Sequence, residues 1–154
     1  MKDERQHLKI QLYEHCLAQV SQSIQTARAA LEAAQESGNE ETKSSAGDKY
    51  ETGRTMMQLE QEKYKVQLLK AIELKNQLAQ LRPGQPGETA EPGSLVFTNL
   101  GNFYLAVGLG KVRLEGLLYF VISLESPLGR QMRGKKKGEG FTFQGKAYMV
   151  EEIV

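Results

Sequence analysis

In the first half of the chain, apolar residues recur at alternating spacings of three and four. Residues 4–36 contain neither Gly nor Pro and are rich in Gln, Ala, Leu and Glu, which favour helix. The apolar series within this segment is Leu17, Val20, Ile24, Ala27, Leu31 and Ala34. This spacing predicts a helix with one narrow apolar face, of the kind found in coiled coils. Gly38 and Asn39 are expected to end it.

A second helix is predicted from about Asp48 to Leu81. Its apolar positions repeat in a similar way: Met57, Tyr64, Leu68, Ala71, Leu74, Leu78 and Leu81. Arms of about 32 residues would each be about 48 Å long, which is more than a small core needs. We therefore expect residues 1–82 to form an antiparallel coiled-coil hairpin, with an acidic tip near residues 40–51.

A linker is predicted at residues 83–93. Three of the four prolines lie in this segment, and each is followed by Gly. Proline removes a backbone donor and fixes φ, so neither a helix nor a central strand can continue through the segment. It separates the predicted hairpin from a C-terminal domain at residues 94–154.

The pattern of the C-terminal domain is that of short strands. Runs rich in aromatic and β-branched residues are broken by Gly and Asn, at Leu95–Thr98, Phe103–Val107, Val112–Leu114, Leu117–Ser123, Phe141–Phe143 and Lys146–Ile153. Ser126 and Pro127 match a helix N-cap and first helical residue, followed by a short helix to Met132. The prediction is an α+β chain whose small antiparallel β-sheet carries one short helix. Because a core of about 60 residues is marginal alone, we expect it to pack against the base of the hairpin.

Composition and charge narrow the function classes only slightly. The net charge of +1 supplies no global field for nucleic acid or a membrane surface. No apolar run approaches the roughly 18 residues of a membrane span, and the first five residues are too charged for a signal peptide. The one cysteine, Cys16, excludes an internal disulfide and is expected to be buried. A cytoplasmic protein with no membrane partner is expected.

The charges are unevenly distributed along the chain. Residues 36–51 hold five acids and two lysines, whereas residues 126–146 hold six Lys or Arg and one Glu. A charge run between glycines is most often a solvated turn. The alternative is a docking surface for an acidic partner, where charge steers association. No helix-turn-helix or finger pattern accompanies these residues, so direct DNA reading is not expected.

Asp48 and Glu51 are the most informative pair in the acidic segment. Their spacing at a helix start matches a capping box, in which the Asp accepts from an early backbone N–H and the Glu reaches back. The functional alternative is metal binding, since Mg²⁺ prefers hard oxygen ligands and is held by few carboxylates plus waters. Spacing alone leaves both interpretations open.

Two segments carry a resemblance to a known family. Gly47-Asp48-Lys49-Tyr50-Glu51 lies between the two predicted helices, and Ser126-Pro127-Leu128-Gly129-Arg130 precedes Gly134-Lys135-Lys136-Lys137-Gly138-Glu139. With the domain order and length, these segments resemble the bacterial Gre transcript-cleavage factors. That family combines a coiled-coil hairpin with a C-terminal domain folded like an FK506-binding protein. The chain departs from the family pattern after Glu51, where it has Thr52-Gly53-Arg54-Thr55.

The resemblance implies a partner and a site. A Gre-like chain would bind RNA polymerase as a monomer and insert its hairpin into the secondary channel. Asp48 would coordinate a Mg²⁺ shared with the polymerase, and Glu51 would orient or deprotonate the attacking water. The factor would bind no cofactor alone and would be no enzyme by itself. It would act on the nascent RNA 3′ end indirectly, by stimulating cleavage of backtracked RNA.

The remaining candidate residues fall into two groups. Tip residues that could contact the polymerase or RNA are Lys43, Ser44, Ser45, Lys49 and Arg54. Residues that could dock the C-terminal domain on the polymerase are Ser126, Pro127, Arg130, Arg133, Lys135, Lys136 and Lys137.

Three other functions stay open at this point. The chain could occupy the secondary channel and modulate or inhibit transcription without cleavage, as the changed residues after Glu51 would allow. It could be a peptidyl-prolyl isomerase, although a fold does not confer that activity. It could also be a coiled-coil adaptor, for which the acids between the helices would be dispensable.

Overall fold

The computed structural model describes residues 2–43 and 47–154, with side chains placed for residues 3–37 and 53–154. The described chain has three helices and six strands. It forms two compact units, of which one contains residues 18–75 and the other combines residues 1–17 with residues 76–154. Each unit is described by itself below.

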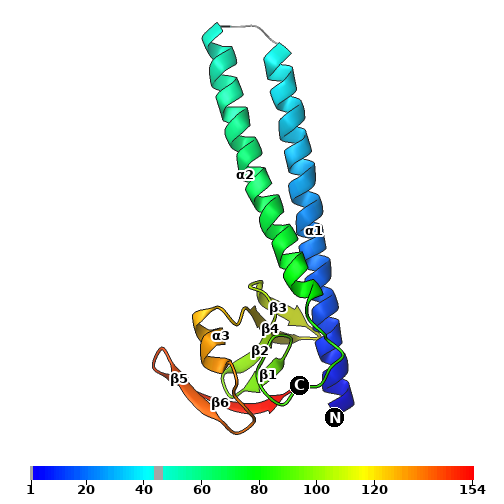
Figure 1. Cartoon of the computed structure of the whole chain (residues 1–154), viewed down its shortest axis with the longest axis vertical. Helices are drawn as coiled ribbons and strands as arrows, with labels where there is room; N and C mark the ends of the chain where they lie inside the picture. The colour runs from blue at the N-terminus through cyan, green and yellow to red at the C-terminus, as the bar shows by residue number, and fades with distance from the viewer. Residues whose placement is uncertain (1, 44–46) are drawn as a thin grey trace. The chain divides into compact units, whose positions relative to one another are not determined.

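The unit of residues 18–75 consists of parts of two long helices. Helix α1 spans Lys2–Lys43 and helix α2 spans Gly47–Ala79; they run side by side in opposite directions (Figure 1). The predicted apolar face of α1 is buried at Val20, Ile24, Ala27 and Ala34. Across the pair, Gln61 Nε2 donates to the Ala34 carbonyl at 3.4 Å. Packing of the two helices on the predicted faces is therefore confirmed.

The predicted end of the first helix is wrong. Helix α1 continues through Gly38 and Asn39 and ends at Lys43. Gly costs a helix interior only about 1 kcal/mol relative to Ala. The residues that follow, Glu40–Lys43, include good helix formers, and continuing the helix satisfies more backbone groups than stopping. Within the described residues, no helix has the long apolar stretch that would let it cross a membrane.

The other unit contains a six-stranded sheet and confirms the α+β class. The strands are β1 (Leu95–Thr98), β2 (Gly101–Leu105), β3 (Gly110–Leu114), β4 (Leu117–Ile122), β5 (Gly140–Phe143) and β6 (Lys146–Ile153). Their order in the sheet is β3-β4-β2-β1-β6-β5. The predicted strands all exist, and their ends differ from the prediction by two residues at most.

The expectation of a purely antiparallel sheet is wrong, because the sheet is mixed. Strand β2 pairs with β4 in parallel, in the register Asn102 to Tyr119 and Leu105 to Ile122. The chain passes from β2 to β3, and the β3–β4 hairpin then brings β4 back beside β2. Alternating side chains have the same period in parallel and antiparallel strands, so the sequence pattern could not reveal this pairing.

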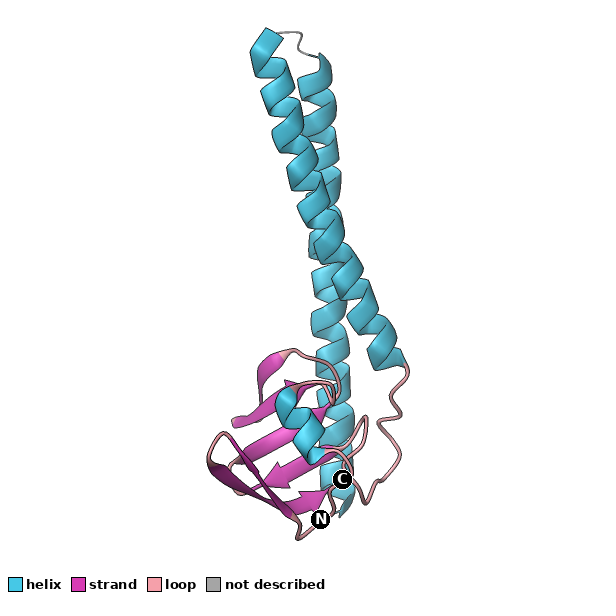
Figure 2. Cartoon of the chain, turned by 60° about the vertical axis from the view of Figure 1, so that its left-hand side comes forward, coloured by secondary structure: helices cyan, strands magenta, loops and turns pink. Residues whose placement is uncertain are grey.

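Helix α3 (Pro127–Met132) lies on one face of the sheet (Figure 2). Its Met132 packs into a buried cluster with residues from three strands, among them Val96, Phe103 and Val150. A row of aromatic rings continues from this cluster, with Phe103 stacked on Phe120 at 5.4 Å between ring centroids. The C-terminal core is therefore built mainly on this face.

The opposite face of the sheet packs against the first four turns of α1. Tyr104 and Tyr119 are completely buried, and the Arg5 guanidinium lies 4.7 Å from the centroid of the Phe97 ring. Arg5 also forms an ion pair with Glu152 of β6. Leu12, also completely buried, comes from the same turns of α1. The expected packing of the small domain against the base of the hairpin is confirmed.

Candidate functional site

The two candidate metal ligands lie in the first turns of α2. Helix α2 is described from Gly47 onward, next to residues 44–46 that lie outside the described chain, so the capping-box alternative for Asp48 stays a prediction. Acids at this end of a helix are favoured by the positive end of its dipole. The side chains of Asp48 and Glu51 lie outside the described residues, and the structure therefore places only their backbone.

The structure describes some of the candidate tip contacts with their side chains, some by their backbone only, and some not at all. Lys43 is the last residue of α1, and Lys49 lies in the first turn of α2. Ser44 and Ser45 lie outside the described residues. Arg54, whose side chain is described, is exposed on α2. A positive charge is thus displayed one helical turn after the candidate acids.

Ser126 and Pro127 begin helix α3 as the sequence predicts. Ser126 has extended backbone angles, and its hydroxyl accepts from the Gly129 N–H at 3.1 Å while donating to the Ser123 carbonyl at 2.6 Å. Gly129 is buried, and a Cβ there would overlap the Ser123 carbonyl oxygen. The Ser-Pro segment therefore has a structural role that fixes the start of α3.

The three consecutive lysines lie on a turn whose backbone is held at both ends. The Lys135 carbonyl accepts from the Ala90 N–H at 2.8 Å, and the Gly138 N–H donates to the Val150 carbonyl at 2.8 Å. The Lys136 N–H donates to the Glu139 carboxylate at 2.9 Å. Lys136 and Lys137 are exposed, so this fixed turn presents two ammonium groups to solvent.

The two arginines of the basic segment lie on α3 and at its end. Arg130 and Arg133 are both exposed. The Arg133 guanidinium is 4.0 Å from the Glu125 carboxylate, at the limit of an ion pair between two largely exposed groups. Such a pair contributes little to stability. Both arginines remain accessible to a partner.

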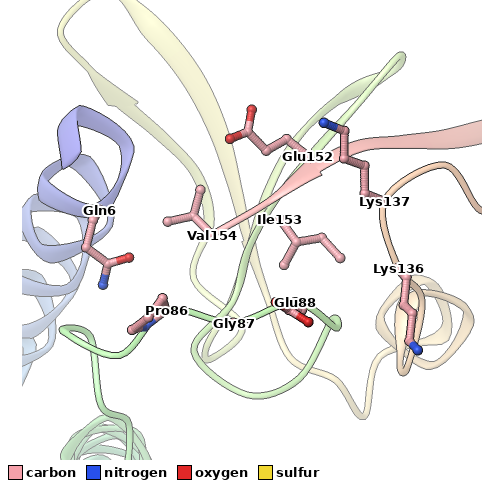
Figure 3. A pocket seen from close by; sticks show the side chains of 9 residues that line it. All are labelled: Gln6, Pro86, Gly87, Glu88, Lys136, Lys137, Glu152, Ile153 and Val154. Carbon is pink, nitrogen blue, oxygen red and sulfur yellow. The ribbon is translucent and has the colours of Figure 1, made fainter. Parts of the chain in front are cut away.

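Beside the lysine turn there is an open pocket of about 750 Å³ (Figure 3). Its walls come from four parts of the chain: Gln6 of α1, residues 86–88 of the linker, Lys136 with Lys137, and residues 152–154. The volume lies within the range of ligand-binding pockets in proteins. Ile153 and Val154 supply an apolar surface, while Gln6 and the two lysines supply polar groups.

The linker wall of this pocket is anchored to helix α1. Gln6 Nε2 donates to the Pro83 carbonyl at 2.9 Å, and Lys9 Nζ donates to the Gln85 carbonyl at 2.7 Å. Lys9 is only 2% exposed, and burial lowers its pKa, an effect that the nearby Glu91 carboxylate partly offsets. The hydrogen bonds position residues 83–88 without any regular secondary structure.

Two tyrosine hydroxyls behind the sheet have no hydrogen-bond partner in the described part of the chain. They belong to Tyr104 and Tyr119. Burial raises the pKa of both, and proximity to Cys16 adds to the effect at Tyr104. Burial likewise raises the pKa of the Cys16 thiol, to about 11. These groups stay protonated at neutral pH and belong to the packing between α1 and the sheet.

Sequence reasoning found the lysine turn but not the pocket beside it. Gln6 and Ile153 are far apart in the chain, and neither belongs to a motif. The one available signal was the proline-rich linker, which predicts a segment with exposed backbone but does not say what it borders. Among the described side chains, no three His, Cys, Asp or Glu residues are grouped as metal ligands.

Comparisons of the chain with family models, with curated proteins and with solved structures gave no match.

Proposed function

We propose that the chain is a Gre-type transcription elongation factor that binds RNA polymerase. In this proposal the paired helices α1 and α2 form a coiled-coil hairpin that enters the secondary channel, and the C-terminal domain is FK506-binding-protein-like. The observation that carries the proposal is a pair of long packed helices with two carboxylates in the first turns of the second. At 1.5 Å per residue, the 33 residues of α2 extend about 50 Å.

Asp48 and Glu51 have separate roles in the proposed mechanism. Asp48 would help to hold a Mg²⁺ that the polymerase shares, and Glu51 would orient the water that attacks the RNA phosphodiester. The metal supplies charge stabilisation for the phosphoryl transfer. The exposed Arg54 of this chain adds a positive charge near the RNA phosphates.

The basic residues of the C-terminal domain support docking. Arg130, Arg133, Lys136 and Lys137 are exposed on α3 and the adjoining turn. They would steer the domain toward an acidic surface of the polymerase. Ser126 and Pro127 contribute by fixing the start of α3, from which Arg130 projects.

The test is RNA cleavage in a stalled, backtracked elongation complex. Purified protein is expected to release short 3′ RNA fragments, and Asp48→Asn or Glu51→Gln is expected to lower that rate about 10²-fold or more. Polymerase binding should be unchanged, because neither carboxylate belongs to the docking surface. Glu62→Gln is the matched control, since Glu62 is an exposed acid further along α2. Equal cleavage by the wild-type protein and both tip variants would contradict the proposal.

A second candidate is a factor that occupies the secondary channel without stimulating cleavage. The residues after Glu51 favour it, because Thr52-Gly53-Arg54-Thr55 places an exposed cation where a metal-binding tip gains from negative charge. In the same assay this candidate predicts no cleavage but slower nucleotide addition, and Arg54→Ala would relieve the inhibition.

A further inference from the structure

We propose that the pocket beside the lysine turn binds an extended acidic peptide segment of a partner protein, which adds to the open edge of strand β6. The inference does not depend on the proposed function, although Lys136 and Lys137 also belong to the docking residues proposed there, because its evidence comes only from the unit of residues 1–17 and 76–154. It rests on the strand pairing, the pocket walls and the charge around them.

The pairing of β6 leaves its last residues open on one side. Strand β6 pairs with β5 from Lys146 to Met149, and Val150 continues that side through hydrogen bonds with Gly138 and Glu139. Beyond Val150, the described residues provide no further strand on this side, whereas on the other side β6 pairs with β1 as far as its end. An unpaired edge of this kind is the usual site of strand addition by a peptide.

The backbone of Ile153 faces this open edge. Leu95 and Val154 exchange two hydrogen bonds, of 3.1 and 2.9 Å, so they form a hydrogen-bonded pair of the β1–β6 ladder. Such pairs alternate with non-hydrogen-bonded pairs in an antiparallel ladder. The neighbouring pair of Val96 and Ile153 is therefore a non-hydrogen-bonded pair. The N–H and C=O groups of Ile153 consequently point away from β1.

The pocket lies along the same edge. Its walls include residues 152–154 on one side, with residues 86–88 and the pair Lys136 and Lys137 on the others (Figure 3). Lys136 and Thr89 form a bridge that ties the linker to the lysine turn. A segment lying beside Ile153 would therefore enter a preformed slot rather than a flat surface, which lowers the cost of ordering it.

Charge complementarity decides the class of partner. Lys136 and Lys137 are exposed at the pocket, and Glu139 is already engaged by the Lys136 N–H. Glu152 is paired with Arg5, which leaves Glu88 as the unpaired acid of the wall. The two lysines outnumber it, so the site favours acidic side chains that alternate with apolar ones on the face of Ile153.

The experiment uses the full chain and a fluorescein-labelled heptapeptide of alternating Glu and Val. Fluorescence anisotropy is expected to give a dissociation constant of about 10–100 µM, and a peptide with Lys in place of Glu is expected to bind at least tenfold more weakly. Free glutamate at the same carboxylate concentration should not compete. Equal binding of the acidic and basic peptides, or full competition by glutamate, would overturn the proposal.

Variants locate the site. Lys136→Glu with Lys137→Glu is expected to weaken binding about tenfold or more, while Lys111→Glu, an exposed reversal on β3 at the other edge of the sheet, should leave it unchanged. Ile153→Pro removes the outward N–H and is expected to weaken binding without breaking the ladder to β1. If Lys111→Glu weakens binding as much as the double reversal, the attraction is diffuse and the site is refuted.

Amide hydrogen exchange distinguishes strand addition from a purely electrostatic attraction, which would not slow the exchange of a particular N–H. In the bound state the Ile153 N–H is expected to exchange at least tenfold more slowly, because the peptide accepts from it. The Val154 N–H, which already donates to the Leu95 carbonyl, serves as the internal control and should change little. Unchanged exchange at Ile153 in saturating peptide would exclude strand addition.

Discussion

At the scale of single residues, several positions combine a sequence signal with a specific contact. Ser126 is an N-cap by sequence, and its hydroxyl accepts from the Gly129 N–H. Gly129 itself gave no such signal, yet its buried position beside the Ser123 carbonyl leaves no room for a side chain. A sequence pattern identifies a cap because the cap bond is local, whereas the space around Gly129 depends on how the backbone of residues 123–126, between β4 and α3, lies against the helix.

Gly129→Ala is therefore expected to destabilise the protein. The new Cβ would overlap the Ser123 oxygen and lie 2.8 Å from the Leu124 Cα, so the backbone must shift. We expect a loss of about 2–4 kcal/mol in the free energy of unfolding, measured by urea denaturation. Gly108→Ala is the control, since a Cβ at Gly108 meets nothing within 4 Å. Equal stability of both variants would contradict this account.

Cys16 makes stability depend on pH in the alkaline range. Burial raises its pKa from 9.0 to about 11, so between these values the unfolded chain loses the proton while the folded chain keeps it. The unfolded state then binds fewer protons, and stability falls as pH rises through this window. Two pKa units correspond to about 3 kcal/mol in the free energy of unfolding. This contribution is fully present below pH 9 and is lost above pH 11.

The measurement compares the wild-type protein with Cys16→Ala by urea denaturation across pH 8 to 11. The variant is expected to lose less stability over this range, although the raised pKa of Tyr104 leaves a slope of the same sign in both proteins. Parallel curves for the two proteins would show that the Cys16 thiol is not the group responsible.

At the scale of elements, the apolar repeat predicts which faces of the helix pair are packed. The strand pattern, in contrast, does not predict how the strands of the sheet pair. The predicted face of α1 is buried, because positions three and four apart lie on one side of any helix. The side of α2 that faces away from its predicted apolar face also carries apolar residues. Among them are Leu59 and Leu69, each 66% exposed. Apolar character alone therefore does not identify the packed face, but its period does.

A pair of truncations tests this distinction. Ile24→Ala, at a position 8% exposed, is expected to cost about 2–4 kcal/mol of stability in the helical unit. Leu59→Ala is expected to change stability by less than about 0.5 kcal/mol, since its side chain is largely in solvent. Thermal unfolding followed by circular dichroism at 222 nm measures both, and a larger loss for Leu59→Ala would reverse the assignment of the two faces.

At the scale of the whole molecule, the two compact units differ from the two domains that the sequence pattern predicts. Residues 1–17 are continuous with the rest of helix α1, yet they belong to the same compact unit as the sheet. They cover the face that carries Tyr104 and Tyr119, and Arg5 joins that face through Phe97 and Glu152. The sheet therefore depends on a segment almost a hundred residues earlier in the chain.

Removing that segment is expected to unfold the C-terminal domain. A fragment of residues 83–154 exposes the apolar face that α1 covers, and about 70 residues then share a one-sided core. We expect it to lose the cooperative unfolding transition seen by near-ultraviolet circular dichroism. A chain in which residues 18–75 are replaced by a short glycine-rich turn keeps the complete unit and should retain the transition. A cooperatively folded 83–154 fragment would contradict this dependence.

The sequence by itself determined the elements of this protein: the helical faces, the linker, the strands and the capped start of α3. Each depends on backbone preferences or on periodicities within a few residues, and these can be recognised in the sequence without knowledge of the fold. Tertiary structure decided the parallel pairing of β2 with β4 and the pocket at Ile153. These features depend on which distant segments meet, and that is set by the burial of surfaces rather than by any local pattern.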